Sequence, residues 1–185
     1  MRKINPDNII IIDDVFPEWF QIFLEKASKD VPWNFCTIKS MHKDTTESFL
    51  TNMVYELGPA KFTDHLNIIK PFNDALTIDV IPRCIPGAKI KQLTRLRWNG
   101  SLRDYELGPH IDYRDGTHWV FVYYVNDSDG DTIFYDTDRV TEIKRCTYQK
   151  GRAVIFPADI YHKADAPKNS PLRISLGAIY TMSVI

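Results

Sequence analysis

Apolar residues recur at helical spacing through the first half of the chain. Pro17 begins a predicted helix with an apolar stripe from Trp19 to Ala27, because residues three and four apart share one helix face. A second helix, begun by Thr45 or Thr46, is expected to carry Leu50, Met53, Val54 and Leu57. A third is expected over about 60–69, ended by Pro71, and a short strand over 8–13 precedes all three.

From about residue 89 the apolar residues alternate with polar ones, which is the period of a strand. Turn residues such as Asn99-Gly100 and Lys150-Gly151 separate the segments. We expect strands over 89–98, 110–114, 118–126, 131–135, 142–148, 152–157 and 172–182. So many short, evenly spaced strands favour an antiparallel sandwich or a barrel-like jelly roll. The predicted fold class is α+β, in one domain over 1–185, with mostly helical support over 1–88 and a β core over 89–182.

Composition excludes several classes of protein. The 185 residues include 44% apolar and 25% charged residues, which is typical of a globular domain. Lys and Arg number 23 against 24 Asp and Glu, so no global basic field draws the chain to nucleic acid or to a membrane. The longest apolar run, near 9–12, is far below the roughly 20 residues of a membrane span. Three scattered cysteines and the lack of a signal sequence favour the cytoplasm.

A possible metal site begins at His110 and Asp112. On a strand, residues two apart point to the same side, so both side chains can bind one ion. His162, just after the predicted strand 152–157, is the candidate third ligand. Two imidazoles and one carboxylate on one face of an ion leave the other face open, as in non-haem Fe(II) oxygenases. The alternative for the pair alone is a surface histidine beside a turn aspartate.

Arg173 lies eleven residues beyond His162, among apolar neighbours on a predicted strand. A buried guanidinium needs an anionic partner. Arg173, Ser175 and Gly177 share one strand face, so a charge, a hydroxyl and open space point the same way. A dicarboxylate such as 2-oxoglutarate suits that face, and an internal salt bridge is the alternative.

Together, these spacings resemble the Fe(II)/2-oxoglutarate dioxygenases. His-x-Asp, about fifty residues, His, then about ten residues to Arg is the pattern of that family, and the likeness extends over about 89–182. Its prolyl-4-hydroxylase-like branch resembles this chain most. Three further segments carry the resemblance: His-Trp-Val-Phe-Val-Tyr-Tyr-Val-Asn at 118–126, Asp-Gly-Asp-Thr-Ile-Phe at 129–134 and Lys-Gly-Arg-Ala-Val-Ile-Phe at 150–156.

The resemblance implies a double-stranded β-helix, a cupin-like jelly roll with N-terminal supporting helices. It implies that Fe(II) is bound by His110, Asp112 and His162. It also implies that the 2-oxoglutarate cosubstrate is contacted by Arg173, Tyr124 and Ser175. For Tyr124, a core tyrosine with a satisfied hydroxyl is the alternative. Where the branch has tyrosines, this chain has Leu107 and Trp98.

The expected activity is a dioxygenase that uses O2 to hydroxylate a C–H bond, with succinate and CO2 as co-products. Because Asp112 is present, no ligand position is left for chloride, and hydroxylation is favoured over halogenation. The expected substrate is a prolyl or other amino-acid side chain, in a small molecule or a peptide; no membrane partner is expected, and the oligomeric state stays open.

Two alternatives remain. One is oxidative nucleic-acid demethylation, suggested by a basic cluster whose default interpretation is a solvated strand face: Lys89, Lys91, Arg95, Arg97 and Arg103. Nucleic acid is nevertheless not expected as a partner, because the second arginine of such demethylases would fall at Ile179. The other alternative is a non-catalytic β-sandwich that binds a metal or a small acid.

Overall fold

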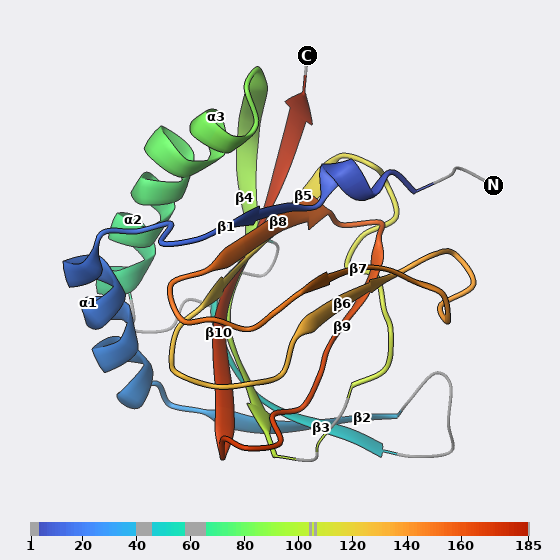
Figure 1. Cartoon of the computed structure of the whole chain (residues 1–185). Helices are drawn as coiled ribbons and strands as arrows, with labels where there is room; N and C mark the ends of the chain where they lie inside the picture. The colour runs from blue at the N-terminus through green and yellow to red at the C-terminus, as the bar shows by residue number, and fades with distance from the viewer. Residues whose placement is uncertain (1–3, 40–45, 58–65, 104, 106, 185) are drawn as a thin grey trace.

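Two antiparallel β-sheets face each other in the computed structural model, which describes residues 4–39, 46–57, 66–103, 105 and 107–184 (Figure 1). The larger sheet has the order β1-β8-β5-β10-β4-β3-β2, and the smaller has the order β7-β6-β9. The strands of the larger sheet are β1 (Ile10–Ile12), β2 (Asn34–Lys39), β3 (Thr46–Glu56), β4 (Ala88–Leu102), β5 (His118–Tyr124), β8 (Ala153–Pro157) and β10 (Leu172–Val184). Those of the smaller are β6 (Thr132–Tyr135), β7 (Glu142–Cys146) and β9 (Tyr161–Ala164).

Helices cover the face of the larger sheet that is turned away from the smaller one (Figure 1). They are α1 (Glu18–Lys29) and a continuous helical stretch of α2 (Leu66–Asp74), the π-helical η2 (Ala75–Val80) and α3 (Ile81–Cys84); a short 3-10 turn, η1 (Pro6–Asn8), precedes β1. None of the described helices is long and apolar enough to cross a membrane.

Strand alternation divides the buried side chains into two cores. On β5, Phe121 and Tyr123 pack with the helices, whereas Val120 and Tyr124 lie between the sheets. Val122 packs beside the second group, so the predicted inward face of this strand is confirmed. Each strand sends alternate residues to opposite faces of the sheet. The two facing antiparallel sheets, with helices on one side, confirm the predicted α+β fold and double-stranded β-helix.

The second predicted helix is wrong, because its residues form strand β3. The spacing from Leu50 to Leu57 fits a helix, but the segment is rich in aromatic and β-branched residues, which favour strands. Asn52 and Val54, two apart, are the buried positions of β3. Pairing with β2 and β4 supplies the backbone hydrogen bonds. The support half is therefore less helical than expected, since β1, β2 and β3 all lie in it.

Two other boundaries also differ from expectation. Pro71 lies inside α2 instead of ending a helix there, and 60–65 lie outside the described residues. The strand expected over 110–114 is reduced to one isolated bridge, from His110 to His162 in β9. Bends surround it, so the His-x-Asp segment borders the smaller sheet without joining it as a strand. The remaining predicted strands are confirmed to within a few residues at their ends.

Candidate active site

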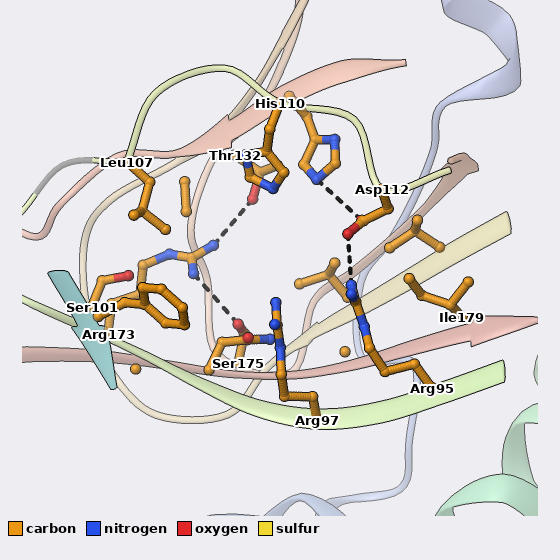
Figure 2. A pocket seen from close by; sticks show the side chains of 18 of the residues that line it. Arg95, Arg97, Ser101, Leu107, His110, Asp112, Thr132, Arg173, Ser175 and Ile179 are labelled. Carbon is orange, nitrogen blue, oxygen red and sulfur yellow. Dashed lines mark hydrogen bonds and ion pairs between the residues drawn. The ribbon is translucent and has the colours of Figure 1, made fainter. Parts of the chain in front are cut away.

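The interior between the two sheets contains a cavity of about 300 Å³. Strands β4, β5 and β10 supply its floor, and the loop from Leu107 to Asp112 lies along its rim. Figure 2 shows Arg173 at one end and His110 and Asp112 at the other, with Arg95 reaching toward Asp112 and Arg97 standing between Arg95 and Arg173. All but one of the six predicted site residues line this cavity: His110, Asp112, His162, Arg173 and Ser175.

The three predicted metal ligands come together although they belong to distant segments of the chain. The bridge between His110 and His162 brings their ring centroids to 4.6 Å. The Nε2 atom of His162 lies 3.6 Å from Oδ2 of Asp112. Backbone amides of Asp112 and Tyr113 both donate to the carbonyl of Ala158, which holds the loop against the chain that leads into β9.

Both histidines are oriented for ligation by Nε2. The Nδ1 atom of His110 lies 3.1 Å from the carbonyl oxygen of Gly108, and that of His162 lies 3.0 Å from the carbonyl oxygen of Ile160. A ring that donates through Nδ1–H has its lone pair on Nε2, and such contacts commonly fix the tautomer of metal-binding histidines. Burial lowers the pKa of His162 to about 4, so its ring is neutral at neutral pH, as ligation requires.

Asp112 is held by Arg95, whose Nη2 donates to Oδ1 at 2.6 Å. Burial alone would raise the pKa of Asp112, but Arg95 and the nearby imidazoles hold it well below its ordinary value. The carboxylate is therefore ionised, with one oxygen on Arg95 and the other beside His162.

The donor set fits Fe(II), since two neutral imidazoles and one carboxylate are the ligands of non-haem iron sites. As the side chains stand, however, no three His, Cys, Asp or Glu residues of the described chain converge as a finished metal site. Ligation by these three residues would therefore require side-chain adjustment around a backbone that already brings them together.

At the far end of the cavity, Arg173 is buried with 2% of its surface exposed. Its Nε donates to the carbonyl of Gly130 at 2.8 Å, and its Nη2 to the hydroxyl of Thr132 at 3.1 Å. Nη1 lies 3.5 Å from the hydroxyl of Ser175. No ion pair joins Arg173 to an acidic residue of the described chain, so the alternative of an internal salt bridge loses its support.

Tyr124 does not line the cavity. Its fully buried hydroxyl donates to Oγ1 of Thr132 at 2.7 Å, and its ring lies under the guanidinium of Arg173, 5.2 Å from Cζ. Thr132 Oγ1 accepts from both Tyr124 and Arg173, which leaves its own hydrogen to donate toward a ligand. The sequence alone did not point to Thr132, which does line the cavity.

The basic cluster is divided by position along the chain: its first two members and its last are exposed, and its two central arginines line the cavity. Lys89, Lys91 and Arg103 are exposed, but Arg95 and Arg97 line the cavity, so the default of a solvated face is wrong for these two. In the sequence, the spacing of two residues between Arg95, Arg97 and Asn99 indicated that these side chains share one face of the strand. Trp98 points the other way, is fully buried in the helix-side core, and does not contact the cavity.

Histidines outside the site have other roles or fall outside the description. His118 contacts Asp115 at 2.7 Å through Nδ1 and Thr181 at 3.1 Å through Nε2, which fits its expected structural role. His42 and His65, expected to be solvated, lie outside the described residues.

Comparison with known proteins shows which family the β core of this chain resembles. Residues 94–180, which contain every predicted site residue, match the model of the 2OG-Fe(II) oxygenase superfamily. No curated protein sequence matches the chain.

Several solved structures share the fold. An oxidoreductase of the 2OG-Fe(II) oxygenase family from Burkholderia pseudomallei is 11% identical, with a TM-score of 0.72 over 95% of this chain and 85% of that one. A prolyl hydroxylase from Trichoplax adhaerens, in complex with a hypoxia-inducible-factor peptide, is 13% identical, with a TM-score of 0.63 over 94% and 83%. HygX from Streptomyces hygroscopicus, with nickel, 2-oxoglutarate and hygromycin B bound, is 11% identical, with a TM-score of 0.63 over 94% and 82%.

Over residues 94–180 the chain is similar to the 2OG-Fe(II) oxygenase superfamily, and the solved structures above share its fold. This superfamily uses Fe(II), 2-oxoglutarate and O2, as the resemblance implied, and its members are oxidoreductases. At identities of 11–13%, the structural likeness to prolyl hydroxylases establishes a shared fold and leaves the substrate open.

Proposed function

We propose that the protein is an Fe(II)- and 2-oxoglutarate-dependent hydroxylase, with succinate and CO2 as co-products, that acts on an amino-acid side chain, prolyl or other. The observation that carries the proposal is the presence, in one cavity, of His110, Asp112 and His162 at one end and Arg173 at the other. When bound, Fe(II) and 2-oxoglutarate supply the oxidising chemistry with O2, and the chain supplies orientation.

In this proposal, His110, Asp112 and His162 hold the iron, and Arg173 holds the distal carboxylate of 2-oxoglutarate. Arg173 presents a planar fork that matches a carboxylate. Ser175 and the free hydrogen of Thr132 add two hydroxyl donors beside it. Tyr124 acts as a positioning residue, because its hydrogen bond fixes Thr132.

Asp112 favours hydroxylation over halogenation, because its carboxylate takes the ligand position that chloride would need. Nucleic-acid demethylation has less support, since the position expected for a second arginine is Ile179, an aliphatic residue on the cavity wall. Two of the structural neighbours hold a hypoxia-inducible-factor peptide and hygromycin B, respectively, so a small molecule or a peptide fits this cavity architecture. The free thiols of Cys36, Cys84 and Cys146 support a reducing compartment, which we propose is the cytoplasm.

The test measures binding before turnover. Anaerobic titration should show one Mn(II) or Fe(II) per chain and 2-oxoglutarate binding that depends on the metal. Loss of a residue that only hydrogen-bonds a metal ligand lowers metal affinity by roughly 10–100-fold. Asp112→Asn changes a proposed ligand itself and should lower metal affinity by more than that. Asp115→Asn, which alters an exposed carboxylate on His118, is the matched control and should bind normally.

Turnover is then measured as succinate release with panels of free amino acids, prolyl peptides and N-methylated nucleotides. Hydroxylated product coupled to succinate supports the proposal, and formaldehyde from the nucleotides favours demethylation instead. Metal and 2-oxoglutarate binding without any succinate, with or without these compounds, contradicts it and favours a binding protein.

A further inference from the structure

Arg97 is a cation in the cavity wall that forms no ion pair with any described residue, although the charges of Asp112 and Glu56 act on it from further away. No hydrogen bond or ion pair joins its side chain to any residue that the structure describes, and its Nε atom is enclosed without an acceptor. Its one recorded partner is the ring of Phe49, whose centroid lies 6.0 Å from Cζ. By contrast, Arg95 is paired with Asp112, and Arg173 donates to three oxygen atoms.

An enclosed N–H group without an acceptor, such as Nε of Arg97, is unfavourable because its lost hydration is not replaced, while the rest of this half-buried side chain lines the cavity. Burial, with the nearby charge of Arg95, lowers the pKa of Arg97 to about 10, so the group is still charged at neutral pH. A protein that keeps such a group in a cavity wall gains its compensation when a bound anion supplies the acceptors.

The balance of charges indicates which molecule brings that anion. Among the described residues of the cavity wall, three carry a guanidinium and one carries a carboxylate: Arg95, Arg97 and Arg173, and Asp112. Ligating histidines are neutral. Fe(II) brings two positive charges and 2-oxoglutarate two negative ones, so loading both leaves the surplus positive charge unchanged. A third component, the primary substrate, is therefore expected to carry negative charge.

The sheet register separates Arg97 from the 2-oxoglutarate anchor. Arg173 on β10 pairs with Ser101 on β4, and Gly177 on β10 pairs with Arg97 on β4. Arg97 thus lies four residues before Ser101 on β4. At about 3.4 Å per residue, these positions are roughly 14 Å apart along the strand. Gly177 carries no side chain, so nothing rises from β10 directly opposite Arg97. In Figure 2 Arg97 reaches into the cavity beside Arg95, from the same strand.

We propose that Arg97 binds a carboxylate of the primary substrate. This inference rests on the proposed function and narrows it: the substrate is a free amino acid or another small carboxylic acid, and not an internal residue of a peptide. A guanidinium in the wall binds such a group by paired hydrogen bonds, which orient the substrate as well as retain it.

The experiment follows the side-chain Nε–H signals of the arginines by NMR, with the Zn(II)-loaded protein as a diamagnetic form. Arg97→Lys and Arg173→Lys identify the two signals by their loss, and triple-resonance assignment replaces these variants if either does not fold. First 2-oxoglutarate is added to saturation, and then acetate is titrated as the carboxylate probe. Arg103, exposed and outside the cavity wall, is the internal control.

The expected result is that 2-oxoglutarate shifts the Arg173 signal, and that acetate then shifts the Arg97 signal saturably without moving that of Arg103. The inference is overturned if 2-oxoglutarate shifts the Arg97 signal and acetate added afterwards does not, since Arg97 then holds the cosubstrate. It is also overturned if Arg97 responds to neither. Failure of the proposed function looks different: Zn(II) does not bind, or Arg173 ignores 2-oxoglutarate.

Turnover provides an independent arm, with L-proline and L-prolinamide as a matched pair that differs in the carboxylate. For an acid that is turned over, Arg97→Gln should raise the half-saturating concentration of that acid on the order of 100-fold, while the half-saturating concentration of the cosubstrate changes little. Arg103→Gln should leave both unchanged. Equal turnover of an acid and its amide by the wild type, unaffected by Arg97→Gln, overturns the inference.

Discussion

The two faces of the larger sheet differ sharply although they are built from the same strands. On the helix side, β4, β5 and β10 present Trp98, Phe121 and Leu176, which are buried in an aromatic and aliphatic core. On the cavity side, the same strands present Arg97, Val122 and Ser175. Adjacent residues thus face a packed core and a cavity, respectively, so single substitutions on the two faces should have separable effects.

The largest effect is expected from Phe121→Ala on the helix side. This side chain is 1% exposed and contacts Phe16 and Phe72, so its loss should lower the free energy of unfolding by about 3–5 kcal/mol. Val122→Ala, the matched neighbour on the cavity side, should cost only about 1–2 kcal/mol. Urea denaturation of the metal-free proteins measures both. Equal losses would show that the two faces are not distinct in this way.

Arg173→Lys tests the cavity side. An ammonium cannot reproduce the bidentate fork, so the binding free energy of 2-oxoglutarate should weaken on the order of 2–5 kcal/mol, while Mn(II) affinity changes little. Because the guanidinium donates to Gly130, Thr132 and Ser175, we also expect the free energy of unfolding of the cosubstrate-free protein to fall by about 1–3 kcal/mol.

Anaerobic calorimetry and urea denaturation measure the two parts of that prediction, with Arg103→Lys as the control. A variant that is destabilised but binds 2-oxoglutarate normally would make Arg173 a structural residue, and the cosubstrate anchor would have to be found elsewhere.

The pH dependence of stability should reveal His162. Its pKa is lowered to about 4 by burial, against an ordinary value of 6.5. Between these values the unfolded chain binds a proton that the folded chain does not, so the stability present above pH 6.5 is lost as the pH falls toward 4. The loss from this group amounts to about 3 kcal/mol at most. Metal-free protein and His162→Gln are compared by urea denaturation at pH 7 and 4.5, and parallel pH profiles would refute the assignment.

Ser175→Ala should have the smallest effect. The hydroxyl of Ser175 is one donor beside Arg173. Its removal should weaken the binding of 2-oxoglutarate by about 1 kcal/mol, which is roughly fivefold in affinity. The unfolding free energy should change less than it does in Arg173→Lys. A loss as large as that of Arg173→Lys would mean that Ser175, and not the guanidinium, dominates the contact.

Local patterns in the sequence predicted the strand core, and together with the family resemblance they predicted most of the candidate site. Period-two alternation identified the inward face of β5, and the spacing of His110, Asp112, His162 and Arg173 pointed to residues that do line one cavity. Such patterns are readable because side chains alternate along a strand whatever its neighbours are.

Contacts between distant segments account for what those patterns did not predict. Strand β3 has apolar spacing that suits a helix, and its pairing with β2 and β4 joins residues whose proximity the local sequence does not encode. The same holds for Thr132, whose hydroxyl accepts hydrogen bonds from both Arg173 and Tyr124, and for Arg97, whose enclosed Nε atom depends on what surrounds β4. Burial and hydrogen-bond partners are properties of packed surfaces, so they emerge only when the two sheets close on each other.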